Sequence, residues 1–144
     1  MAAAAADADK ADRLLGQAIV GRKEGGSVWG WGGISKKLAA KLEPGSRTAE
    51  QYLEARLNIS KCMLVRAQLP GKAAADKAKL LAEAKRAISF TRQVQPKLGG
   101  ESFSKRFEKL LKDIQKAEGV PETGFRELDE KEQASKPVPA EVGK

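Results

Sequence analysis

The sequence contains no histidine and a single cysteine, Cys62. Without histidine, neither a Ser-His-Asp nor a Cys-His catalytic arrangement can form. With one cysteine there can be no intramolecular disulfide, and the usual zinc sites built from cysteine and histidine are excluded. Cys62 falls on an apolar stripe, where an inert thiol is more common than a nucleophile. We therefore expect a protein that is not an enzyme and that holds no metal or cofactor.

Aromatic residues make up only 5% of the chain, so the core must be mostly aliphatic. Long hydrophobic runs are also missing, and none approaches the roughly 20 residues of a membrane-spanning helix. The N-terminus, Met1 followed by five alanines, lacks the basic and leucine-rich regions of an intact secretory signal. A trimmed end of an exported protein would look similar, so the sequence leaves the cellular compartment open.

The residues that are abundant favour helices. Hydrophobic residues account for 41% of the chain and charged residues for 32%, as in soluble globular proteins. Alanine, lysine, leucine and glutamate dominate, and all four are strong helix formers. A length of 144 residues suits one domain with a core of its own.

The net charge of +8 is unevenly distributed along the chain. Only four of the 27 Lys/Arg residues but six of the 19 Asp/Glu residues lie after residue 118. The first 118 residues therefore carry a net charge of +10, and the last 26 carry −2. A field of this kind favours acidic partners, whether nucleic acid, an anionic membrane surface or an acidic protein.

Apolar stripes at helical spacing predict five helices, at about residues 2–23, 31–42, 48–69, 72–95 and 101–118. The third is apolar over a wide arc, which indicates a central helix covered on both flanks. Thr48 and Gln51 fit the capping-box pattern at its start. Pro70-Gly71 makes a turn short enough to bring the fourth helix back antiparallel to the third. The sequence therefore predicts an all-α, five-helix antiparallel bundle.

Beyond Gly119 the pattern changes, because prolines, glycines and charges interrupt any regular spacing. We predict a helical domain over residues 1–118 and a flexible C-terminal tail over residues 119–144. Phe125 and Leu128 allow an alternative, a short element that docks onto the domain. A solvated tail is the more common arrangement at a chain terminus.

The third and fourth predicted helices carry residues at the spacing of a helical hairpin repeat. In the third helix these are Ala55, Asn58, Ile59 and Ser60. In and just after the fourth helix they are Ala84, Ile88 and Pro96. This pattern resembles one elongated tetratricopeptide repeat over residues 55–118 at most, with the fifth helix beginning a truncated second repeat. The aromatic positions differ, since Arg56 stands where tryptophan is common and Met63 replaces a tyrosine. The resemblance implies right-handed helical hairpins that serve protein contacts.

The resemblance and the basic composition together predict a partner-binding groove between the third, fourth and fifth helices. Polar and basic groups beside apolar stripes suit an acidic or C-terminal peptide segment, and the candidates are Asn58, Lys61, Lys85 and Arg92. Trp29 and Trp31 lie in a glycine-rich stretch, residues 25–33. They form either an exposed platform for a partner or anchors that hold the loop. We favour anchors, because so flexible a loop needs something to hold it.

The function that we favour from the sequence is a helical-repeat module that binds another protein. Two other functions are also consistent with the sequence. Lysines and arginines recur along the fourth and fifth predicted helices, as in a nucleic-acid or ribosome-associated protein. No aromatic residue is interleaved with them, so a solvated basic face is the more common interpretation. A structural subunit of a homo-oligomer, whose acidic tail contacts a basic neighbour, is the third hypothesis.

Overall fold

Six α-helices make up the part of the chain that the structure, a computed structural model, describes. These residues are 2–22, 30–43 and 45–135, with the backbone alone given for residues 2–5 and 135. The helices are α1 (Ala2–Val20), α2 (Trp31–Ala39), α3 (Arg47–Ala67), α4 (Ala74–Val94), α5 (Glu101–Glu118) and α6 (Phe125–Ser135). No β-strand occurs in these ranges. The all-α prediction is confirmed.

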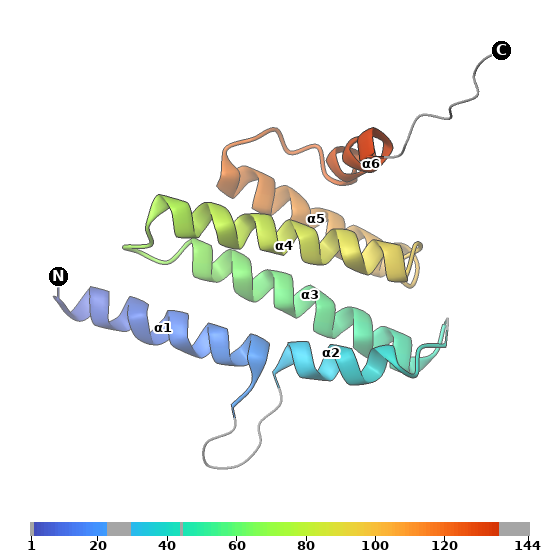
Figure 1. Ribbon diagram of the computed structural model, residues 1–144, viewed down its shortest axis with the longest axis horizontal. Coiled ribbons are helices and arrows are strands. Elements are labelled where there is room, and N and C mark those ends of the chain that lie inside the picture. The colour runs from blue at the N-terminus through green and yellow to red at the C-terminus, as the bar shows by residue number, and fades with distance from the viewer. Residues whose placement is uncertain (1, 23–29, 44, 136–144) are drawn as a thin grey trace.

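The helices are arranged around α3 (Figure 1). Helices α1 and α2 follow one another along one side of α3, and α4 lies along its other side. Helix α5 packs against both α3 and α4. Helix α6 stands over α4 and α5, apart from the other helices. The prediction of a central third helix with neighbours on both flanks is thereby confirmed.

Polar side chains join α3 to α4 and fix their relative direction. Ser60 Oγ donates a hydrogen bond to the carbonyl oxygen of Ala84 at 3.2 Å. Arg56 Nε donates to Thr91 Oγ1 at 3.0 Å. The partner numbers rise along α4 as they fall along α3, so the two helices are antiparallel, as the Pro70-Gly71 turn predicts. Ser60 and Thr91 are fully buried, and these bonds satisfy groups that would otherwise be costly to bury.

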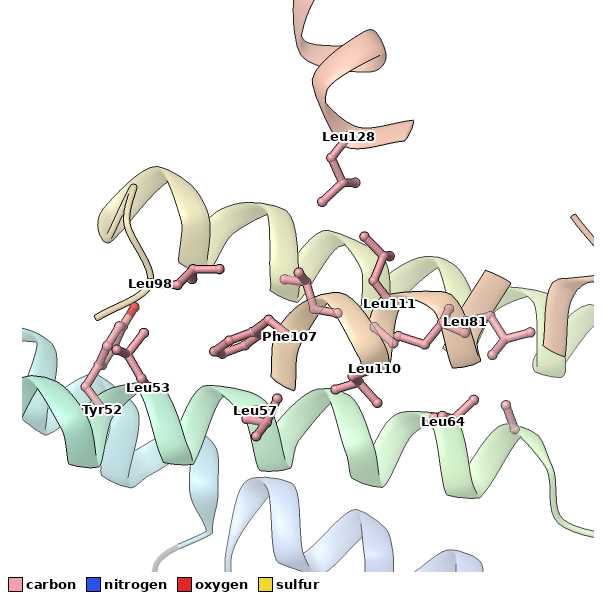
Figure 2. Packing of buried hydrophobic residues seen from close by; sticks show 14 residues of the cluster. Tyr52, Leu53, Leu57, Leu64, Leu81, Leu98, Phe107, Leu110, Leu111 and Leu128 are labelled. Atoms are coloured by element: carbon pink, nitrogen blue, oxygen red, sulfur yellow. The ribbon is translucent and has the colours of Figure 1, made fainter. Parts of the chain in front are cut away.

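The apolar core is filled by one face of α5 (Figure 2). Phe107, Leu111 and Ile114 are fully buried and pack with apolar side chains of α3 and α4. Leu53 and Leu81 belong to the same cluster and are also fully buried. Tyr52 and Phe107 are the aromatic residues among the buried side chains of this cluster in the described part of the chain, so the core is mostly aliphatic, as the composition requires. Burying such side chains contributes about 1.5–3 kcal/mol each before the entropy of folding is subtracted.

The start of α3 differs from the capping-box prediction, which is wrong in position. The N-cap residue is Ser46, not Thr48. The backbone of Ser46 is extended, and its hydroxyl oxygen accepts a hydrogen bond from the amide of Ala49 at 3.1 Å. Thr48 lies within the first turn of the helix instead. Serine is as good an N-cap as threonine, so sequence alone could not decide between the two.

Part of the predicted flexible tail, residues 119–144, forms a helix in the structure. Phe125–Ser135 forms α6, and Leu128 is only 7% exposed within the core cluster. The physical reason is that acidic side chains of this segment pair with basic side chains of α4 rather than with water. The alternative, a docking element at Phe125 and Leu128, describes this segment better. Residues 136–144 lie outside the described residues.

The junction between α1 and α2 depends on close backbone contact. Gly30 is buried before α2, and a Cβ added to it would lie 2.3 Å from the amide nitrogen of Gly21 and 2.5 Å from the carbonyl oxygen of Ile19. These are backbone atoms, so no rotamer change could relieve the clash. At Gly33, by contrast, an added Cβ would meet no atom within 4 Å.

We predict that Gly30→Ala destabilises the protein by about 1–3 kcal/mol, because α1 and α2 must move apart to accept the methyl group. The matched control is Gly33→Ala, an exposed position inside α2. It should stabilise by up to about 1 kcal/mol through helix propensity. Urea unfolding followed by circular dichroism measures both changes. A Gly30→Ala protein as stable as the parent would contradict the described contact.

Candidate functional site

A buried lysine on α4 forms ion pairs with carboxylates of two other helices. Lys85 is 8% exposed. Its Nζ forms ion pairs with Glu118 Oε2 at the end of α5 and, at 2.7 Å, with Glu127 Oε1 of α6. Burial lowers the pKa of Lys85, but pairing with the two carboxylates outweighs this and raises it above its usual value. The ammonium group therefore stays charged and links three helices.

Gln115 of α5 holds the beginning of α6 in place. This side chain is fully buried, and its Nε2 donates hydrogen bonds to Glu127 Oε2 at 2.8 Å and to the carbonyl oxygen of Gly124 at 3.2 Å. The amide of Gly124 donates to Gln115 Oε1 at 2.9 Å. Gly124 has φ +60, which glycine adopts without strain. The carboxamide of Gln115 thus pairs with both the amide and the carbonyl oxygen of Gly124.

The pKa of Glu127 reflects this environment. Burial would raise it, but hydrogen bonds from Lys85, Gln115 and Lys131 outweigh burial and lower it to about 2. The carboxylate is therefore ionised at pH values well above 2. At neutral pH its negative charge is part of the contact between α6 and α4.

A second charged pair lies along the same face of α4. Arg92 Nη2 donates to Asp129 Oδ1 at 2.8 Å, and its guanidinium carbon lies 4.6 Å from the centre of the Phe125 ring. Between the two charged pairs, Leu128 points from α6 toward Leu111 of α5 (Figure 2). We use the name α6-binding surface for the side chains of α4 and α5 that receive α6, which are Lys85, Arg92, Leu111 and Gln115.

Glu118 gives the α6-binding surface a negative group of its own. Its Oε2 is within ion-pair distance of Lys85 Nζ, although the geometry does not satisfy the directional requirements of a hydrogen bond. We regard the contact as an ion pair, since electrostatic attraction depends on distance more than on angle. Lys85 thus has one acidic partner within the α4–α5 hairpin and a second in α6.

Two open hollows border the α6-binding surface. One, of about 400 Å³, lies between α4 and α6 and is lined by residues including Arg86, Ser89 and Leu128. The other, of about 550 Å³, lies between the first half of α4 and the end of α5. Its lining includes the apolar Ala78, Leu81 and Val120, together with Lys77 and Lys85. Helix α6 therefore covers only part of the face that α4 and α5 present.

The structure brings together two of the six predicted partner-binding residues. Lys85 and Arg92 both belong to the α6-binding surface. Asn58 and Lys61 lie on α3, half-buried and exposed respectively, and Lys61 is near Glu54 on that helix. The space predicted as a groove between α3, α4 and α5 is occupied by the core side chains of α5.

Of the two tryptophans, only Trp31 belongs to the described residues, and it lies apart from this surface. Trp31 is half-buried at the first position of α2. Trp29 lies outside the described residues.

Sequence reasoning missed most of the acidic side of the contact. Glu127 and Asp129 fell within the predicted flexible tail, and neither Glu118 nor Gln115 was singled out. One signal was present: Gln115 interrupts the apolar face of the fifth helix, one turn after Leu111. An amide in that position needs buried partners, and the chain that follows supplies them.

Comparison with protein-family models, curated protein sequences and solved structures returned no match for this chain. Within the described residues no group of three or more potential metal-binding side chains occurs, and no helix has the length and hydrophobicity of a membrane span. The site must therefore be interpreted from its own chemistry.

We predict that Glu127→Gln flattens the acid side of the stability curve. The pKa of Glu127 falls from 4.5 to about 2 on folding, so its charge stabilises the fold above about pH 4.5 and does so less as the pH falls toward 2. Glutamine cannot ionise, so the variant should be less stable near neutral pH and should approach the parent near pH 2. Urea unfolding at several pH values measures the difference.

The control is Glu130→Gln, at a residue of α6 that is 63% exposed and pairs with Arg126 of the same helix. It should follow the parent protein at every pH. A Glu127→Gln protein that loses the same stability at neutral and acid pH would contradict the role of the charge.

Proposed function

We propose that this chain is a non-enzymatic, tetratricopeptide-like helical module that binds an acidic helical segment of another protein at the α6-binding surface. The observation that carries the proposal is α6 itself, an acidic amphipathic helix held by Lys85, Arg92 and an apolar contact at Leu128. A surface that accepts one such helix has the charge and shape to accept another. Helix-in-groove recognition of this kind uses apolar anchors flanked by charges.

The distribution of charge supports an acidic partner. The first 118 residues carry +10, and the segment that occupies the surface comes from the acidic end of the chain. Arg92 uses its guanidinium group twice, for a carboxylate and for an aromatic ring. Arginine is suited to this double role because its planar group pairs with acids and stacks on rings.

The packing of α3 against α4 supports the likeness to a tetratricopeptide repeat. The positions that carry the resemblance include Ala55, Ser60, Ala84 and Ile88. All four are fully buried. Small residues at such positions let two helices approach closely, which is the basis of the repeat's hairpin.

The perturbed groups support a binding role over a catalytic one. A lysine nucleophile needs a lowered pKa, and that of Lys85 is raised. A reactive cysteine also needs a lowered pKa, and burial raises that of Cys62. Glu127, with a pKa of about 2, is a weak base. Lys85 and Cys62 are thus held in their protonated, unreactive forms, and Glu127 is too weak a base for proton abstraction.

One observation favours the nucleic-acid alternative. Lys109, Lys112 and Lys116 are exposed along α5, and none of them takes part in an ion pair within the described residues. Their spacing places them on one side of the helix. Unpaired lysines of this kind bind phosphate backbones with a steep dependence on salt concentration.

We predict that a labelled peptide with the sequence of residues 121–135 binds the full chain that carries Glu127→Gln and Asp129→Asn. Those changes weaken the chain's own helix without altering the α6-binding surface. Adding Arg92→Glu should weaken peptide binding at least about tenfold, because a favourable charge pair becomes repulsive. A peptide with arginine in place of Asp129 should recover most of that loss. Fluorescence anisotropy measures all four combinations.

The matched control is Lys79→Glu, the same reversal of charge at an exposed position of α4 outside the α6-binding surface. It should change the affinity less than about twofold. Absence of saturable binding would remove the proposed function. Single-stranded RNA that binds at low salt, and that Arg92→Glu does not affect, would favour the nucleic-acid alternative instead.

A further inference from the structure

We infer that α6 is a resident competitor on this surface, and that the partner which displaces it is an amphipathic helix with the order aromatic, any residue, Glu, Leu, Asp. This inference rests on the proposed function and specifies its ligand. The order is that of Phe125 to Asp129, whose side chains make the contacts described above.

Helix α6 is attached through side chains rather than through close backbone packing. The backbones of α3, α4 and α5 approach one another along their lengths, and that of α6 stands off from them (Figure 1). Within α6 Leu128 is the buried apolar residue, and Phe125 is partly buried. Arg126, Glu130 and Lys131 are each more than 60% exposed. Release of this helix therefore uncovers little apolar surface.

The rest of the structure keeps most of its polar partners when α6 leaves. Lys85 retains Glu118, which belongs to α5. Gln115 retains both backbone groups of Gly124. Arg92, by contrast, loses Asp129 and Phe125 together. The vacated surface would present the unpaired guanidinium group of Arg92 and the side chain of Leu111 that α6 had covered, which call for an acid and an aliphatic side chain at the spacing of Asp129 and Leu128.

The connector, residues 119–124, keeps α6 tethered to the end of α5. Gly119 and Gly124 adopt φ +77 and φ +60 at the two ends of residues 119–124. Because Gln115 fixes Gly124, the movement is confined to the chain beyond it. A tethered segment competes at an effective concentration of about millimolar. A free partner must therefore gain contacts that α6 does not make.

The hollow between α4 and the end of α5 supplies such contacts. It is contiguous with the α6-binding surface, since Lys85 belongs to both. Its apolar wall contains Ala78, Leu81 and Val120, and Val120 is 40% exposed. A partner whose additional apolar side chain reaches this hollow would bind more tightly than α6 alone.

The experiment compares the affinity of the residue 121–135 peptide for three full-length proteins. These are the parent chain, the Glu127→Gln/Asp129→Asn chain, and a matched chain with Glu122→Gln/Glu130→Gln. The last pair removes two exposed carboxylates from the same part of the sequence and leaves the contacts with Lys85 and Arg92 intact. Amide hydrogen exchange over residues 126–135 reports directly whether α6 is docked.

If α6 competes, the Glu127→Gln/Asp129→Asn chain binds the peptide at least about tenfold more tightly than the parent, because the competent surface is no longer occupied. The matched chain binds like the parent. Saturating peptide should also accelerate exchange in α6 of the parent chain. Equal affinity for all three proteins, with α6 of the free parent chain unprotected from exchange, would show that α6 does not occupy the surface; it would overturn the competition and leave the proposed function standing. Lack of binding to any of them would remove both.

Discussion

The ammonium group of Lys85 imposes the constraint on which the C-terminal half of the structure depends. A charge that is nearly buried must be paired, because desolvation of an unpaired ammonium costs several kcal/mol. Glu118 and Glu127 supply the pairing from two different helices. The same lysine therefore joins the end of α5 to α6 and sets where α6 can lie. The acidic composition of the C-terminal segment is a structural requirement as much as a surface property.

The helices and the core could be predicted because local patterns determine them. Helix α5 begins and ends where the spacing of Phe107, Leu111 and Ile114 and the following Gly119 place it. The antiparallel turn at Pro70-Gly71 follows from chain geometry in the same way. Helix α6 could not be predicted with equal ease, because its stability comes from charges on α4, some 40 residues earlier in the sequence. The charged composition of this segment does not distinguish side chains that face water from side chains that pair with one another.

The binding residues were predictable only in part, and for a related reason. Lys85 and Arg92 share a face of one helix, so their spacing was visible. Asn58 and Lys61 were grouped with them on the assumption that the space between three helices stays open, whereas α5 fills it. Arg56 of α3 donates hydrogen bonds to Thr91 and to the carbonyl oxygen of Ala87 on α4. Side-chain volume and pairing across helices decide such outcomes, and neither follows from periodicity.

The hydrogen bonds between Gln115 and Gly124 also limit the distance over which α6 can move. With that glycine held, a detached α6 swings about a fixed point, and its 11 residues extend about 16 Å if the helix stays intact. Any second surface that captures the released helix must lie inside that radius. A neighbouring molecule would have to lie almost in contact with α4 or α5 for a detached α6 to reach it.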